Sequence, residues 1–201
     1  MSDTRADAIQ AEAAREAARL WPLWFDAARC EEVAAAISAL HDELDAAVAR
    51  QGATCWQSGD CCRFDDYGHR LYVTGLEAAW FLRRHAHRQA AQDDARATDS
   101  RSEPAAADTL LSLPVTDPTN RPASPTEHGA CPYQIDNRCT VHAIRPMGCR
   151  VFFCEPGTEQ WQRETYERFH TRMRELHATH GIAYRYMEWR AALEEGLGVG
   201  V

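Results

Sequence analysis

Apolar residues recur at steps of three and four positions in several segments of the chain, which is the spacing of one face of an α-helix. In residues 31–50, where the pattern is clearest, these residues are Val33, Ile37, Leu40, Leu44 and Val48. The pattern also predicts a helix over 4–20 that breaks or restarts at Pro22. Two further helices are predicted from Thr158 to about His180 and over about 183–195. The expected fold class is mainly α with minor β, as a single helical domain with cysteine-rich loops around a metal centre.

Shorter signals lie between these helices. Leu71-Tyr72-Val73 predicts a short strand, and Thr74-Gly75-Leu76-Glu77 has the form of a capping box that opens a helix to about residue 90. Residues 133–141 predict a hairpin, because Asp136-Asn137 suits a tight turn. Residues 53–69 are expected to be irregular.

Residues 91–126 differ in composition, since they contain five of the nine prolines. We expect a flexible insertion there. The domain organisation predicted from these patterns has N-terminal helices over 1–50, a cysteine-cluster region over 51–157 and C-terminal helices over 158–201, packed as one domain.

Charge excludes several function classes. The chain has 201 residues, a formal net charge of -8 and no lysine, so all 22 basic residues are arginine. An acidic chain is a poor match for nucleic acid or an anionic membrane, and the lack of lysine excludes a phosphate-binding Walker lysine and a lysine Schiff base. The polar N-terminus and the absence of a long apolar run favour a cytoplasmic protein, in which thiols stay reduced.

Seven of the eight cysteines lie in loop-like segments that are rich in Gly, Pro, Asp and Arg, where we do not expect inert core thiols. We predict that these seven are metal ligands: Cys55, Cys61, Cys62, Cys131, Cys139, Cys149 and Cys154. The eighth, Cys30, lies on a helical segment and is expected to be a small buried apolar residue.

The spacing of the cysteines limits the choice of metal only weakly. No C-x2-C pair is present, and Cys149-x4-Cys154 has a spacing that also occurs in ferredoxins. The adjacent Cys61 and Cys62 are expected to point in different directions and not to share one tetrahedral ion. Because seven thiols exceed the four of a closed zinc site, we favour an iron–sulfur cluster, with zinc as the alternative.

Four arginines accompany the cysteines. Arg63, Arg138 and Arg150 are direct neighbours of a cysteine, and Arg145 lies four residues before Cys149. They would offset the negative charge of a thiolate centre, or they are ordinary surface arginines. The sequence leaves both interpretations open.

The order of these motifs resembles a known family. The chain reads Cys55-Trp-Gln-Ser58-Gly-Asp-Cys61-Cys62, then Thr74-Gly-Leu-Glu77, Cys131-Pro132, Cys139 and Arg145-Pro146-Met-Gly-Cys149-Arg150. Over about residues 54–154 this resembles the CxxCxxCC, or YkgJ-like, cysteine-cluster family, described as zinc- or iron-chelating proteins. The resemblance implies a metal site built from these cysteines.

One position departs from the family pattern, because Ser58 replaces its second cysteine. We hypothesise that Cys154 fills the vacated position, with Asp60, His69 and His142 as lesser candidates. The two histidines are expected to be hydrogen-bonding loop residues.

The sequence therefore predicts a cysteine-cluster metal-binding protein, iron–sulfur before zinc, with a redox or metal-transfer role. Its expected partners are a metal ion or cluster and a redox or metal-delivery protein, with neither nucleic acid nor membrane. A zinc-stabilised structural module is the second interpretation, and an enzyme of unknown substrate is the third. Of the remaining histidines, His170, His177 and His180 are predicted to form a solvated helix face.

Overall fold

The structure is a computed structural model that describes residues 3–52, 59–99, 129–153 and 155–200. The described residues are mainly helical, as predicted, with two small two-stranded sheets. The longer helices are α1 (Asp3–Arg29), α2 (Glu31–Arg50), α4 (Gly75–Asp99), α6 (Glu159–Thr179) and α7 (Trp189–Val199). The short helical segments are η1 (Asp60–Cys62), α3 (Phe64–Tyr67), η2 (His142–Ile144) and α5 (Met147–Val151). Neither Cys55 nor Cys154 belongs to the described residues.

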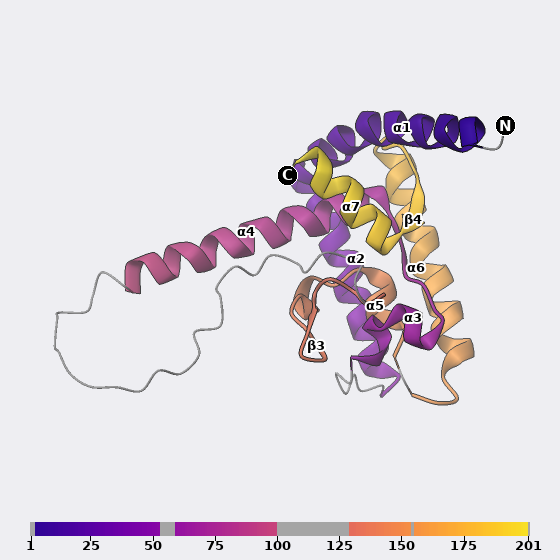
Figure 1. Cartoon of the computed structure of the whole chain (residues 1–201). Helices are drawn as coiled ribbons and strands as arrows, with labels where there is room; N and C mark the ends of the chain where they lie inside the picture. The colour runs from indigo at the N-terminus through magenta and orange to yellow at the C-terminus, as the bar shows by residue number, and fades with distance from the viewer. Residues whose placement is uncertain (1–2, 53–58, 100–128, 154, 201) are drawn as a thin grey trace.

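The helices form two packed groups joined by α2. Helix α1 crosses α4 and α7 at one end of the molecule, and α2 runs from there alongside α5 and α6 (Figure 1). The first half of α4 lies within the body, and its second half extends away from the other helices (Figure 1). Strands β2 (Gln134–Ile135) and β3 (Arg138–Cys139) form a hairpin that lies against η1, because the Gln134 side chain donates to the carbonyl of Gly59, the residue before η1.

Aromatic residues of α1 lie at the centre of the core. Trp21 and Trp24 are fully buried and meet edge to face, with ring centroids 5.3 Å apart. The predicted break at Pro22 is wrong, because α1 continues through it. Pro22 lies on the exposed side of α1, where a missing backbone hydrogen bond faces water, and burial of its neighbours offsets the cost of an interior proline.

Helix α2 has the bounds that its apolar spacing predicts, and α6 agrees with its prediction to within one residue at each end. Helix α4 runs to Asp99, beyond the predicted end near residue 90, so residues 91–99 of the predicted insertion are helical. The rest of that insertion, 100–126, lies outside the described residues. The predicted irregular segment over 53–69 contains η1 and α3, and its residues 53–58 are not described.

Strand β1 (Tyr72–Thr74) pairs antiparallel with β4 (Tyr186–Glu188). The prediction of a helix over 183–195 is therefore wrong at its beginning, since α7 begins at Trp189. Strand β4 forms because β1, which lies more than one hundred residues earlier, offers it hydrogen-bond partners, and local apolar spacing carries no trace of that pairing.

The predicted hairpin is confirmed. Strands β2 (Gln134–Ile135) and β3 (Arg138–Cys139) pair in register, with Gln134 opposite Cys139. Asp136 and Asn137 form the turn with φ of 49° and 59°, the left-handed conformation that a two-residue hairpin turn requires.

The predicted capping box is half formed. The Thr74 hydroxyl accepts a hydrogen bond of 3.2 Å from the Glu77 backbone N–H. The Glu77 carboxylate does not return to Thr74. It accepts from the Met147 backbone N–H at 2.6 Å and lies 3.0 Å from His41 Nε2, and its side chain is 1% exposed. Glu77 therefore joins α4 to α2 and to the first turn of α5.

None of the described helices combines the length and the apolar character needed to cross a membrane.

Replacing Glu77 with alanine is expected to lower the free energy of unfolding by about 3 kcal/mol, because His41 and the Met147 N–H would both lose a buried partner. Chemical denaturation measures the loss. The control is Glu43→Ala, which removes an exposed ion pair with Arg172 and should cost far less because water screens that pair. Equal losses in the two variants would contradict the bridging role of Glu77.

Candidate metal centre

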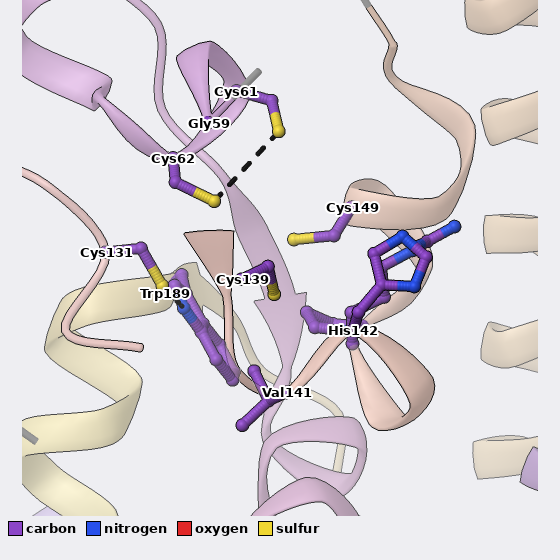
Figure 2. A pocket seen from close by; sticks show the side chains of 11 residues that line it. Gly59, Cys61, Cys62, Cys131, Cys139, Val141, His142, Cys149 and Trp189 are labelled. Carbon is purple, nitrogen blue, oxygen red and sulfur yellow. Dashed lines mark hydrogen bonds between the residues drawn. The ribbon is translucent and has the colours of Figure 1, made fainter. Parts of the chain in front are cut away.

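Five of the seven cysteines that the sequence singles out line one small cavity of about 40 Å³. They are Cys61, Cys62, Cys131, Cys139 and Cys149, and their sulfur atoms face a common space (Figure 2). The remaining two, Cys55 and Cys154, and the departing Ser58 lie outside the described residues. The two cysteine segments, which are far apart in the sequence, thus lie together in the fold.

Backbone hydrogen bonds hold the two segments against each other. The Cys131 N–H donates to the Cys62 carbonyl at 2.7 Å, and the Asp65 N–H donates to the Gly129 carbonyl at 3.2 Å. The Gln134 side chain adds a third bond, to the Gly59 carbonyl, at 2.8 Å. These hydrogen bonds fix the position of η1 relative to the hairpin. They therefore determine which cysteine side chains lie close together.

The prediction that Cys61 and Cys62 point apart is wrong. Their sulfur atoms lie 4.0 Å apart on the same side of η1. A tight 3-10 turn, preceded by Gly59 with φ of +82°, replaces the extended backbone that would send neighbouring side chains to opposite faces. Two thiolates on one tetrahedral zinc ion, with Zn–S bonds of about 2.3 Å, lie about 3.8 Å apart, so these two sulfurs are close enough to share an ion.

The thiols influence each other's protonation. Hydrogen bonding with Cys62 lowers the pKa of Cys61 and of Cys139, each to about 7, and lowers the pKa of Cys131. The same contacts raise the pKa of Cys62, because they favour its protonated thiol. Burial raises the pKa of Cys149. The cavity therefore combines three thiols of lowered pKa with two thiols of raised pKa.

Trp189 is a site residue that sequence reasoning missed. It is the first residue of α7, is 1% exposed, and its indole Nε1–H donates to the Cys131 sulfur at 3.5 Å. Phe81 of α4 packs edge to face on the Trp189 ring, with centroids 4.8 Å apart. No local pattern could have found this contact, because it depends on how the C-terminal segment returns to β1.

The four cysteine-associated arginines have different positions. Arg145 lines the cavity. Arg150 is buried and donates to Asp45 and to the carbonyls of Arg145 and Ala143, while Arg63 pairs with Asp66. Arg138 is exposed on β3. Of the four, the structure therefore leaves Arg145 as the one at the cavity wall.

Of the three lesser candidate ligands, one lines the cavity and two do not. His69 does not line the cavity and hydrogen-bonds to the Cys61 carbonyl at 3.1 Å, which confirms the expected loop role. Asp60 is the first residue of η1 and is likewise absent from the cavity lining. His142 does line the cavity, and its Nε2 is buried with no hydrogen-bond partner among the described residues, so its expected bonding is wrong for that atom. Burial lowers the pKa of His142, which keeps its imidazole neutral at pH 7.

Two further predictions are wrong. Cys30 is exposed, because it lies at the junction of α1 and α2, where the chain turns at the surface. His177 is 2% exposed and therefore does not belong to a solvated face. The chain turns back after α6, so that His177 Nδ1 lies 3.3 Å from the Ile182 carbonyl.

The donor set matches the chemistry of a thiolate-bound metal, because all five sulfurs belong to one cavity and a cationic side chain adjoins them. Across the described ranges, however, no three His, Cys, Asp or Glu side chains are already placed as the ligands of an ion. Side-chain movements would therefore have to draw the thiols inward around a metal.

No family model, no curated protein and no solved structure matches this chain.

Gly59→Ala tests the contact between η1 and the hairpin. A Cβ at Gly59 would lie 2.5 Å from the Asn137 carbonyl oxygen and 2.5 Å from Gln134 Nε2. Gly157→Ala is the matched control, because its φ of +83° is nearly the same and no atom lies within 4 Å of the added Cβ. Both variants should lose about 1–2 kcal/mol from the left-handed backbone, and Gly59→Ala should lose more. Thermal unfolding of the two variants measures the difference.

Trp189→Phe tests the indole bond to Cys131. Trp80→Phe is its control, since the Trp80 Nε1–H is buried without a hydrogen-bond partner among the described residues. Both changes reduce ring size, but Trp189→Phe also removes a hydrogen bond, so it should destabilise the protein by about 1 kcal/mol more than Trp80→Phe. Urea unfolding gives the comparison, and a larger loss in Trp80→Phe would refute the assigned bond.

Proposed function

We propose that this protein binds a metal centre through its cavity cysteines, with an iron–sulfur cluster as the first candidate and a redox or metal-transfer role. The observation that carries the proposal is the meeting of five thiols from two distant segments in one cavity. Disulfide bonding is not their state here, since all five are free cysteines. Iron–sulfur clusters and zinc are both inorganic groups that proteins hold with several thiolates.

The number of thiols supports the iron–sulfur candidate. A closed zinc site needs four protein ligands, and this cavity offers five sulfurs before Cys55 and Cys154 are considered. A multinuclear centre would use the additional thiols. Bound at the cavity, it would supply one-electron redox chemistry, and the chain's own part would be to hold it, shield it from water and balance its charge.

Two observations favour zinc as the second candidate. The cavity of about 40 Å³ matches the space for a single ion more closely than that for a cluster. The 4.0 Å separation of the Cys61 and Cys62 sulfurs is also close to the spacing of two thiolates on one zinc ion. In that case the metal would stabilise the fold, with an apparent contribution of about 10 kcal/mol or more.

The YkgJ-like resemblance of the cysteine motifs agrees with both candidates, because that family is described as zinc- or iron-chelating. Charge bears on the partner only by exclusion. With a net charge of -8, the chain is poorly suited to nucleic acid, and the partner proposed with the metal centre is a metal-delivery or redox protein.

Purification without oxygen, followed by assays of iron, zinc and acid-labile sulfide, tests the proposal. A coloured protein with iron and sulfide supports the cluster, and a colourless protein with stoichiometric zinc supports the second candidate. A protein that binds neither metal, as purified or after reconstitution, sinks the proposal.

Substitution by serine then identifies the ligands. Cys131→Ser and Cys139→Ser are expected to lose most of the bound metal, because each removes a sulfur that faces the cavity. Cys30→Ser is the matched control and should retain all of it, since Cys30 is exposed and apart from the cavity. Cys154→Ser tests whether that residue fills the position vacated at Ser58, and full metal content in this variant removes that hypothesis.

A further inference from the structure

Three buried nitrogen atoms at the cysteine cavity have no hydrogen-bond partner among the described residues. They are Nε and Nη1 of Arg145 and Nε2 of His142, and both residues line the cavity. Buried polar groups are nearly always paired, so unpaired ones call for an explanation. The need for an explanation is greatest for a guanidinium group, because it keeps its positive charge at any pH at which the protein is folded.

Arg150 shows that the surroundings of this segment can provide hydrogen-bond acceptors for an arginine side chain. It lies five residues after Arg145 and donates to Asp45 and to two backbone carbonyls, one of which is that of Arg145 itself. No such carboxylate or carbonyl accepts from Nε or Nη1 of Arg145 within the described chain. The contrast indicates that the described part of the fold leaves these two nitrogens of Arg145 available to a further group.

The charges around Arg145 indicate what that group is. Arg145 lines the same small cavity as the five thiols, so its positive charge lies close to them. Neither unpaired nitrogen makes a hydrogen bond to a sulfur atom of the described cysteines. Thiolates drawn inward around a metal would bring negative charge and acceptor sulfur to the centre of the same cavity.

We propose that Arg145 is the positioning residue that balances the charge of the bound metal centre and donates hydrogen bonds to its sulfur atoms. The proposal deepens the proposed function and rests on it. It assigns the charge-balancing role to Arg145 alone among the four cysteine-associated arginines, because Arg63 and Arg150 have carboxylate partners and Arg138 is exposed. His142 lines the same cavity as Arg145, with a neutral imidazole.

The test compares Arg145→Gln with Arg138→Gln, which removes the same charge from an exposed position beside Cys139. Competition with a chelator measures metal retention by each purified protein. We expect Arg145→Gln to hold the metal at least about tenfold more weakly than the wild type, and Arg138→Gln to match the wild type. If the centre is an iron–sulfur cluster, its midpoint potential should fall in Arg145→Gln, because loss of a positive charge disfavours the more negative reduced state.

Stability of the metal-free proteins separates this role from a structural one. Metal-free Arg145→Gln should be at least as stable as the metal-free wild type, because it removes a half-buried cation of which two nitrogens have no hydrogen-bond partner among the described residues. Lower stability of the metal-free variant, or wild-type metal retention by it, overturns the proposal while leaving the metal centre intact. If Arg145→Gln does not fold, Arg145→Lys decides, since intermediate retention supports the proposal and wild-type retention overturns it. A wild-type protein that binds no metal instead overturns the proposed function.

Discussion

The site depends on one contact between chain segments that are far apart in the sequence, the 2.7 Å hydrogen bond from the Cys131 N–H to the Cys62 carbonyl. Bringing these residues together closes a long loop, which costs conformational entropy before any sulfur atoms meet. The hydrogen bonds from Asp65 to Gly129 and from Gln134 to Gly59 help to offset that loss of entropy. The absence of a side chain at Gly59 permits the close approach of the two segments. Without this junction, the cysteines of η1 would have no defined relation to those of the hairpin and α5.

The core reaches the site through Glu77. Its carboxylate is buried between α2 and α4 and accepts from the Met147 N–H, the first residue of the helix that carries Cys149. A negative side chain at a helix N-terminus is well placed to satisfy backbone donors that would otherwise be unpaired. From the opposite side, Trp189 connects α7 to Cys131. The position of the cavity is therefore determined by its links to the core through Glu77 and Trp189, and not by loop conformation alone.

Sequence reasoning succeeded where the signal is local. The apolar spacing of α2 and the Asp136-Asn137 turn both express short-range chemistry, and the structure agrees with each. The clustering of cysteines in polar segments singled out the five that line the cavity. Sequence reasoning failed where a distant segment decides. Helix α1 continues through Pro22 because the core holds both sides of it, β4 exists because β1 is its partner, and Trp189 meets Cys131 through the same return of the chain. No single window of sequence contains these contacts.

The cysteine cavity brings thiols together with nitrogen atoms that have no hydrogen-bond partner among the described residues. Hydrogen bonding with neighbouring thiols raises the pKa of Cys62, and two nitrogens of Arg145 have no hydrogen-bond partner in the described part of the chain. A low-dielectric site tolerates such an arrangement poorly, because uncompensated charge and unpaired donors cost most where water is excluded. A cation at the centre would release the thiol protons, turn repulsion among thiolates into shared ligation and place acceptor sulfur near Arg145. The proposed metal centre would therefore pair with both the clustered thiols and the unpaired nitrogens of the cavity wall.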